Sequence, residues 1–357
     1  MPNLTAVAIP AHDEAERIAA CLEALDAQAG AQVDHIVLLA NNCSDGTAAL
    51  ARAVRLQSGA RLHVVERRLP PHQANAGHAR RLAMQHAAAL AGPGGVLLTT
   101  DADGRVDPTW LAANLAALAA GADAVAGWVE LDAIEWGRIP AILHQDDARE
   151  CAYDALCDEI HALLDPDPAD PLPRHTQHSG ASIAVTAAAY ARCGGVPDLA
   201  SGEDRAFIAA LRRVDARVRH APEVHVTVSG RIEGRSRGGM ADTIRRRLDG
   251  PDPYLDDRLE PALDCARRAT SRRLLREGGG DALAASLGLD PGWLRSVQAT
   301  GPGAAWQAVE AASPALRRRR VAVPDLPNQM EVAQAILAAL RPADRSDSPA
   351  FAAQPPA

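Results

Sequence analysis

The chain has 357 residues and a formal net charge of −8, with 47% hydrophobic and only 3% aromatic residues. This length suits one large α/β domain with an appendage, or two domains. All 37 basic residues are Arg, which excludes a P-loop lysine, a Schiff-base lysine and a pyridoxal-phosphate anchor. The negative net charge argues against a general nucleic-acid-binding protein.

The first part of the chain alternates short apolar runs with Ala- and Leu-rich stretches. Strands are predicted at 5–9, 35–40, 62–66, 96–100 and 124–129. Helices are predicted between them at 15–27, 47–58, 79–91 and 108–120. This alternation, with nearly continuous apolar strands, predicts a mostly parallel sheet covered by helices on both faces. Asp13 is expected to cap the first helix, with Glu16 completing a capping box, and Asp45 is expected to cap the second.

A Pro-rich segment, DPDPADPLP at 165–173, opens the second part and predicts a loop or mobile lid. After it we expect a strand-like run at 181–185 and a helix that ends at Cys193-Gly194-Gly195. A helix at about 205–214 and a strand-like run at 224–228 follow. From about 240 the sequence is Arg-rich and helical. We therefore predict three regions: a first domain at 1–240, a helical C-terminal region at 241–340 and a disordered tail at 341–357.

The six cysteines are dispersed and form no zinc-like spacing, which predicts free thiols in a reducing compartment. No signal peptide is expected at 1–14, because a basic segment followed by an apolar one is missing there. The longest apolar stretch, 111–129, contains Asn114 and Asp123, so no transmembrane segment is expected. We therefore expect a cytoplasmic protein, and a peripheral contact with a membrane surface stays open.

Two carboxylates follow the apolar strand at 96–100, in the run Asp101-Ala102-Asp103-Gly104. In open α/β sheets, ligands bind at the carboxyl ends of strands. Two carboxylates so close repel each other unless a cation or water lies between them, and a hard cation such as Mg²⁺ or Mn²⁺ prefers oxygen ligands. This pattern predicts a metal site, and the alternative is a solvated turn that caps the next helix.

An acidic pair, Glu203-Asp204, follows Gly202 at the start of a predicted helix. One of the two carboxylates is a candidate for the base that deprotonates an acceptor hydroxyl. The alternative is that both only stabilise the first turn of the helix, where acidic residues are favourable.

A Gly- and Arg-rich loop at 229–239 contains Arg231 and Arg235. Arginine offers forked hydrogen bonds to phosphate, so this loop is predicted to close over an anion. The alternative is a solvated basic loop.

Five short motifs occur in the order typical of family 2 glycosyltransferases of the GT-A fold. They are Pro10-Ala11-His12-Asp13-Glu14, Asn41-Asn42-Cys43-Ser44-Asp45-Gly46-Thr47, Gly77-His78-Ala79-Arg80, Asp101-Ala102-Asp103, and Gly194-Gly195 followed by Glu203-Asp204. The chain therefore resembles this family over about residues 4–240. The resemblance implies a GT-A α/β domain at 1–240 with a mostly parallel sheet, followed by the C-terminal helical extension.

The resemblance also implies roles for individual residues. The expected nucleotide-sugar-binding residues are Pro10, Asp13, Glu14, Asn41, Arg80, Asp101, Arg231 and Arg235, with Asn41 facing the base. Asp101 and Asp103 are the expected metal ligands, and His225 lies near the place where family members often have a metal-binding His. Asp204 is the expected catalytic base of an inverting displacement, with Glu203 as the second candidate.

Two departures from the family pattern limit what the resemblance implies. The paired acids usual in the second motif are Ala40 and Asn41 here, which leaves open whether the donor is a UDP- or a GDP-sugar. The Gln-x-x-Arg-Trp motif of polymerising members is missing from the sequence, which favours the transfer of a single sugar.

We therefore expect a metal-dependent glycosyltransferase that uses Mg²⁺ or Mn²⁺ and no nucleic acid. Its partners are a nucleotide-sugar donor and a small-molecule or glycan acceptor that the sequence does not identify. Three alternatives stay open: a nucleotidyltransferase acting on a sugar phosphate, a retaining enzyme, and a catalytically inactive sugar-nucleotide-binding protein.

Overall fold

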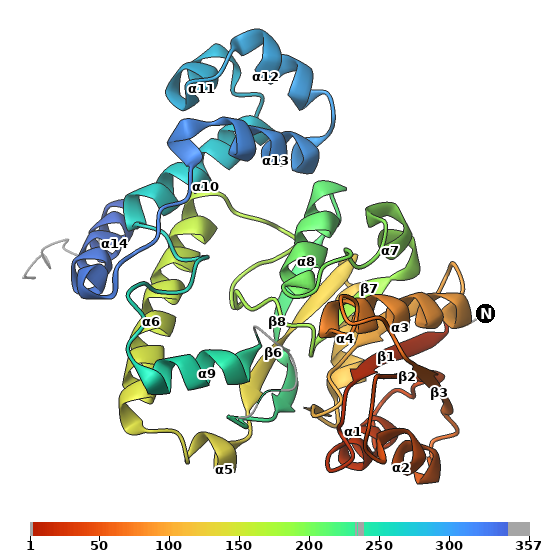
Figure 1. Ribbon diagram of the computed structural model, residues 1–357. Coiled ribbons are helices and arrows are strands. Elements are labelled where there is room, and N and C mark those ends of the chain that lie inside the picture. Colours follow the sequence, from red (N-terminus) through yellow and green to blue (C-terminus); the bar gives the residue numbers. More distant parts are fainter. Residues whose placement is uncertain (1–2, 233, 235–238, 342–357) are drawn as a thin grey trace, which may run out of the picture.

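The structure is a computed structural model that describes residues 3–232, 234 and 239–341. Arg235 and the expected tail from residue 342 onward lie outside the described residues. At the centre is an eight-stranded sheet in the order β3-β2-β1-β4-β7-β6-β8-β5 (Figure 1). Its strands are β1 Thr5–Ala11, β2 His35–Asn41, β3 Arg61–Arg67, β4 Val96–Thr99, β5 Arg105–Val106, β6 Ala124–Leu131, β7 Ile183–Thr186 and β8 Val218–Val228.

The sheet is mixed, and the directions of its strands decide which segments meet at one edge. Strands β1 to β4 run parallel to one another, and β6 runs parallel to β8. Only β7 and the short β5 are antiparallel to the strands beside them. One edge therefore collects the carboxyl ends of β1, β2, β4 and β8 together with the chain that enters β7. The predicted α/β class is confirmed.

Helices cover both faces of the sheet, because successive side chains of the central strands alternate between two cores. Val7 and Ile9 of β1 face one core, with α1 Ile18–Asp26, α2 Thr47–Ala53 and α4 Trp110–Ala119. Ala6 and Ala8 face the other core, with α3 Ala76–Ala91, α7 Ala187–Cys193 and α8 Glu203–Arg213. All four strand residues are fully buried, as a sheet with two covered faces requires.

A helical region lies beside this sheet in Figure 1. Its helices are α6 Ala141–Leu164, α9 Met240–Asp249, α10 Ala262–Arg276, α11 Gly280–Leu287, α12 Pro291–Gln298, α13 Pro302–Ala312 and α14 Leu326–Leu340, with the short α5 Ala133–Trp136 preceding α6. Tyr153 and Ile160 of α6 pack in one core with Cys265 of α10 and Leu337 of α14. Helix α6, which was not predicted from the sequence, thus packs with helices that follow residue 261.

The structure corrects several local predictions. Helix α1 begins at Ile18, with Arg17 rather than Asp13 at its N-cap. Asp13 adopts a left-handed backbone conformation and accepts hydrogen bonds from the amides of Ser44 and Asp45 instead. Helix α2 has Gly46 rather than Asp45 at its N-cap, although the side chain of Asp45 accepts from the Thr47 amide at 2.9 Å. Helix α2 ends at residue 53 rather than 58, and β8 begins at 218 rather than 224.

Two general predictions hold in the part of the chain that the structure describes. All six cysteines are free thiols. Within residues 3–232, 234 and 239–341, no helix is both long enough and apolar enough to cross a lipid bilayer.

Candidate active site

A cavity of about 610 Å³ opens at the edge where the carboxyl ends of β1, β2, β4 and β8 meet. Nine of the residues predicted for the site line it: Pro10, Glu14, Asn41, Arg80, Asp101, Asp103, Glu203, Asp204 and Arg231. They come from both halves of the chain, and the topology of the sheet brings them together. Ligands bind at this edge in α/β proteins.

Arg80 is the centre of the buried polar network in this cavity. Its Nε lies 2.9 Å from Oε1 of Glu203, and its Nη2 lies 2.7 Å from Oδ1 of Asp101. Nη1 donates to the hydroxyl of Thr99 and to the carbonyl of Gly180, each at 2.8 Å. Burial alone lowers the pKa of Arg80, but Asp101 and Glu203 together hold it above its ordinary value. Glu203 therefore serves as the counter-ion of a buried cation.

Asp103 lies in a region of excess negative charge. Burial and the neighbouring Asp101 raise the pKa of Asp103 well above its ordinary value, and Arg231 opposes them from 3.3 Å. Arg231 also donates to Glu14, with 2.8 Å between Nη1 and Oε2. One guanidinium is thus shared by two carboxylates, so a further cation beside Asp103 would relieve the repulsion.

Asp204 occupies the first turn of α8, directly after Gly202. Its Oδ2 accepts a hydrogen bond from the amide of Gly180 at 3.1 Å, and its Oδ1 accepts from the amide of Arg205 at 2.7 Å. No Arg or His among the described residues forms an ion pair with this carboxylate. Asp204 is therefore held in position by neutral donors and faces the cavity, which distinguishes it from Glu203.

Asn41 lies at the end of β2 and is 2% exposed. Its Nδ2 donates to the carbonyl of Asn75 at 3.3 Å. Its Oδ1 is buried without a hydrogen-bond partner among residues 3–232, 234 and 239–341. A buried amide oxygen without a donor costs free energy, so this acceptor fits a ligand that brings an N–H group.

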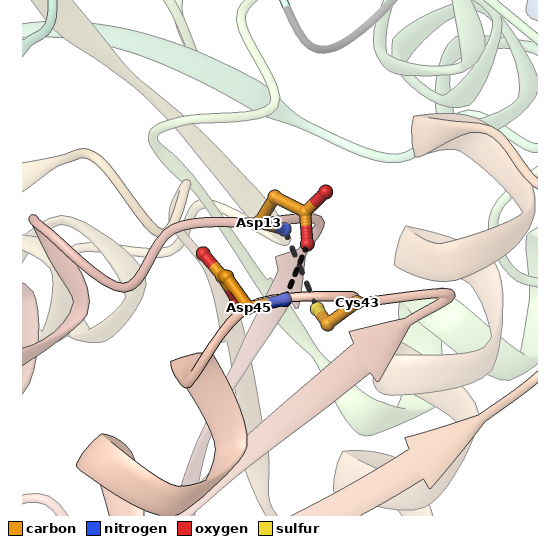
Figure 2. Close-up of side chains that lie close together, drawn as sticks. All are labelled: Asp13, Cys43 and Asp45. Carbon is orange, nitrogen blue, oxygen red and sulfur yellow. Dashed lines mark hydrogen bonds between the residues drawn. The ribbon is translucent and has the colours of Figure 1, made fainter.

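Asp13 does not line the cavity. Figure 2 shows that it points to the turn after β2, where it lies close to Cys43 and Asp45. One ligand atom from each of these three residues lies within 4.8 Å of the others. Burial raises the pKa of Asp13, but hydrogen bonds from Ser44 and Asp45 outweigh this effect and lower it. Its carboxylate therefore serves to hold the β1 and β2 loops together.

His225 lies within β8 and does not line the cavity. Its backbone carbonyl accepts a hydrogen bond from the amide of Asp107 at 3.1 Å, beside β5. The residues of β8 and its following loop that reach the cavity are Val228, Ser229 and Arg231. The structure thus places His225 apart from Asp101 and Asp103.

Gly180, which precedes β7, was not among the site residues predicted from the sequence. Its carbonyl accepts from Arg80 and its amide donates to Asp204. A Cβ atom at this position would lie 2.3 Å from Cζ of Arg80, so only glycine allows the guanidinium this close. The available signal was a Gly in a run of small residues just before the predicted strand at 181–185.

The comparisons with known proteins agree with these motifs. The family model described as Glycosyl transferase family 2 matches residues 6–161. No curated protein matches the chain.

Three solved structures are similar at low sequence identity. Glucosyl-3-phosphoglycerate synthase from Mycobacterium tuberculosis, in complex with Mn²⁺, UDP and phosphoglyceric acid, is 18% identical over 71% of this chain and 81% of its own, with a TM-score of 0.43. S. aureus TarS 1–349 in complex with UDP is 16% identical over 93% and 87%, with a TM-score of 0.45. The mannosyltransferase PcManGT from Pyrobaculum calidifontis, in complex with GDP-Man and Mn²⁺, is 17% identical over 95% and 74%, with a TM-score of 0.44.

These structural likenesses are distant, so the assignment depends on the family match and on the motifs that line the cavity. Residues 6–161 of this chain are thus similar to glycosyl transferase family 2, a match that spans less than half of the chain.

Proposed function

We propose that this enzyme transfers a single sugar from a nucleoside-diphosphate sugar to an acceptor hydroxyl, with Mg²⁺ or Mn²⁺ bound at Asp103. The observation that carries the proposal is the meeting of Asp101, Asp103 and Asp204 in one cavity at the edge of the sheet. Acidic metal ligands and a separate carboxylate base are the two groups that such a displacement requires.

Asp103, supported by Asp101, would hold the metal. Both offer the carboxylate oxygens that Mg²⁺ and Mn²⁺ prefer. When bound, the metal neutralises the charge that develops on the departing diphosphate. The raised pKa of Asp103 supports this role, because a hard cation stabilises the ionised carboxylate that burial and Asp101 disfavour. We leave His225 out of this site because it does not line the cavity.

Pro10, Glu14 and Asn41 line the part of the cavity that we assign to the nucleoside. The unpartnered Oδ1 of Asn41 would accept from a ring N–H, which both uracil and guanine carry, so UDP- and GDP-sugars both remain candidates. Arg231 would turn from Glu14 toward the diphosphate and supply forked hydrogen bonds. The role predicted for Arg235 stays a prediction, and Asp13 would act on this site only by shaping the loop.

Asp204 would take the proton of the acceptor hydroxyl as it attacks the anomeric carbon. Its carboxylate has only amide donors as partners, whereas Glu203 is bound to Arg80. Attack from the face opposite the departing diphosphate would invert the anomeric configuration. We therefore propose an inverting transferase with Asp204 as the base.

We further propose that residues 1–240 form the catalytic domain, with α6 belonging by its packing to the helical region at 241–340. Six free cysteines favour a reducing compartment, and we propose the cytoplasm.

The proposal is tested by incubating the protein with UDP-, GDP- and TDP-sugars and measuring release of the nucleoside diphosphate, with Mn²⁺ or with EDTA. We expect release from a UDP- or GDP-sugar that requires the metal. Release of pyrophosphate from a nucleoside triphosphate and a sugar phosphate would identify a nucleotidyltransferase instead. Binding of the donor without any release would identify a catalytically inactive protein.

A further inference from the structure

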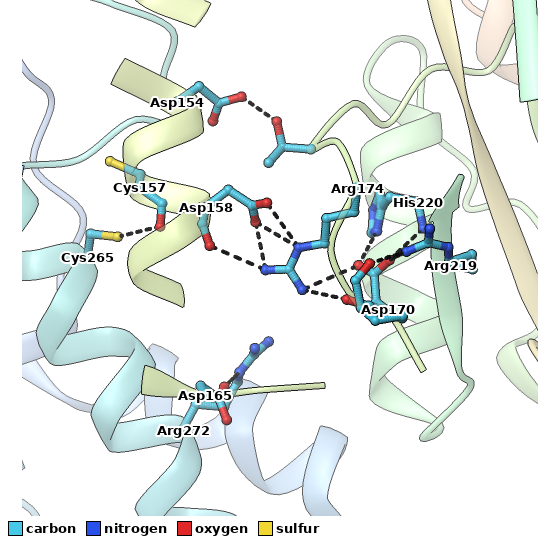
Figure 3. Close-up of polar contacts among 12 residues, drawn as sticks. Asp154, Cys157, Asp158, Asp165, Asp170, Arg174, Arg219, His220, Cys265 and Arg272 are labelled. Atoms are coloured by element: carbon cyan, nitrogen blue, oxygen red, sulfur yellow. Dashed lines mark hydrogen bonds and ion pairs between the residues drawn. The ribbon is translucent and has the colours of Figure 1, made fainter. Parts of the chain in front are cut away.

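A second cavity, of about 600 Å³, lies between the sheet and the helical region, and Figure 3 shows part of its polar wall. Residues of α8 and β8 form one side, and residues of α6, α10 and α13 form the other. Ten arginines and seven carboxylates line it. The lining therefore carries an excess of positive charge, in a protein whose net charge is −8.

Several of these arginines are neutralised by carboxylates in the wall. Arg174 binds Asp158, with 3.0 Å between Nε and Oδ1. Arg272 and Arg276, however, share a single carboxylate, that of Asp165, whose side chain is completely buried. The Pro-rich segment that begins at residue 165 is thus tied to α10, and it borders this cavity rather than the donor cavity.

Arg212, in the last turn of α8, lines the cavity without a carboxylate of its own. Its guanidinium forms no hydrogen bond or ion pair with any residue that the structure describes, and it keeps accessible surface toward the cavity. The exposed guanidinium of Arg212 is therefore available to an anion that enters the cavity.

The lowered pKa values of two histidines that line the cavity reflect the same excess of positive charge. Burial and then the cation of Arg272 lower the pKa of His161 to about 3. Burial and then the cation of Arg212 lower the pKa of His178 to about 2. Both rings are therefore neutral at pH 7 and add hydrogen-bonding groups without opposing an anion.

The two cavities meet at His178 and Arg205, which line both. Arg205 follows Asp204 directly in the first turn of α8. A ligand that fills the second cavity can therefore extend toward the carboxylate that we assign as the base. This connection relates the positive cavity to the acceptor rather than to the nucleotide.

We propose that the arginine-lined cavity binds an oxyanion carried by the sugar acceptor, such as a phosphate group, with Arg212 as the main counter-ion. The identification of the anion as part of a sugar acceptor rests on the proposed transferase function. The binding of an anion in this cavity does not depend on it. Arginine suits a tetrahedral oxyanion because its planar fork donates two parallel hydrogen bonds.

The test uses inorganic phosphate as the probe, with EDTA present so that no metal contributes. Binding is followed by calorimetry and by the melting temperature in the wild type, in Arg212→Gln and in the matched control Arg192→Gln. Arg192 is an exposed arginine of α7 that lines neither cavity. We expect phosphate to bind and stabilise the wild type and R192Q. Its affinity for R212Q should be at least about tenfold lower.

The melting temperature in the absence of phosphate distinguishes anion binding from a role of Arg212 in folding. Without phosphate, we expect R212Q to melt at the same temperature as the wild type, because Arg212 is exposed and its guanidinium has no ion pair with any described residue. A lower melting temperature of R212Q, equal phosphate affinity in R212Q and wild type, or equal stabilisation by sodium chloride at the same ionic strength would each overturn the inference.

Separate titrations of the wild type with UDP and with GDP, each in the presence of Mn²⁺, distinguish this inference from the proposed function. Binding of UDP without any effect of phosphate would overturn only the anion site. Binding of phosphate without binding of UDP or GDP would overturn the assignment of the anion to a sugar acceptor.

Discussion

The guanidinium of Arg80 lies 2.7 Å from Oδ1 of Asp101, so the protein itself neutralises one carboxylate of the Asp101–Asp103 pair. Asp101 is thereby fixed in position. Among the described residues Asp103 forms an ion pair with Arg231, at 3.3 Å, and that cation is shared with Glu14. The two aspartates thus differ in their ion pairing, and Asp103 is the one that we propose as the main metal ligand.

Replacement of Asp103 with Asn should separate activity from stability. We expect sugar transfer to fall about 100-fold or more, since several factors of ten follow from the loss of a metal ligand. The melting temperature of the metal-free protein should not fall, because a neutral amide removes repulsion with Asp101 and Glu14. Steady-state kinetics and thermal denaturation check both statements, and retained full activity would exclude Asp103 from catalysis.

The acidic pair of α8 offers a matched comparison between a base and a counter-ion. Asp204→Asn should bind the donor normally and lose about 100-fold or more in turnover. Glu203→Gln should instead destabilise the fold by about 3 kcal/mol, because it breaks a buried ion pair with Arg80. Donor affinity, kcat and chemical denaturation are measured for both variants. Unchanged turnover in D204N would move the base elsewhere.

Gly180→Ala should disturb the site through Arg80. The added Cβ would lie 2.3 Å from Cζ of Arg80, so the guanidinium must move away from Asp101 and Glu203. We expect a loss of about 1–3 kcal/mol in the free energy of unfolding together with weaker donor binding. Gly94→Ala is the control, because the nearest heavy atom to its Cβ would be 3.8 Å away. Equal effects of the two substitutions would contradict this role of Gly180.

Much of this site could be predicted from the sequence, because its first motifs follow the apolar strands that the pattern of residues identifies. Pro10, Asn41 and Asp101 follow predicted strands directly, and parallel strands place their carboxyl ends at one edge. Asp13 was misplaced because capping by Asp and the bridging of two loops have the same sequence signature. Nothing local distinguishes them.

The second cavity was not predictable in the same way. Asp158 and Arg174 flank the Pro-rich segment, Arg212 lies on α8 and Arg272 on α10, and none belongs to a short motif. Helix α6 was missed as well, since much of its surface is polar and only positions such as Tyr153 and Ile160 are fully buried. Such a site depends on tertiary packing between the sheet and the helical region.

The histidines of the second cavity predict a pH dependence of stability. The pKa of His178 is lowered to about 2, while the unfolded chain binds this proton near its ordinary pKa of about 6.5. The unfolded state therefore binds more protons as the pH falls below about 6.5, and His178 contributes a loss on the order of 1 kcal/mol per pH unit. His178→Gln should lose less stability between pH 7 and 5, as urea denaturation at each pH would show. Parallel losses in both proteins would contradict the lowered pKa.

The central claim is that Asp103 holds a divalent metal that binds the diphosphate of the donor. Calorimetric titration with UDP and with GDP, in Mn²⁺ and in EDTA, tests it on the wild type and on Asp103→Asn. We predict that one diphosphate binds the wild type only when the metal is present, and that D103N binds it in neither condition. Binding that is equal in EDTA, or equal in D103N, would contradict the claim.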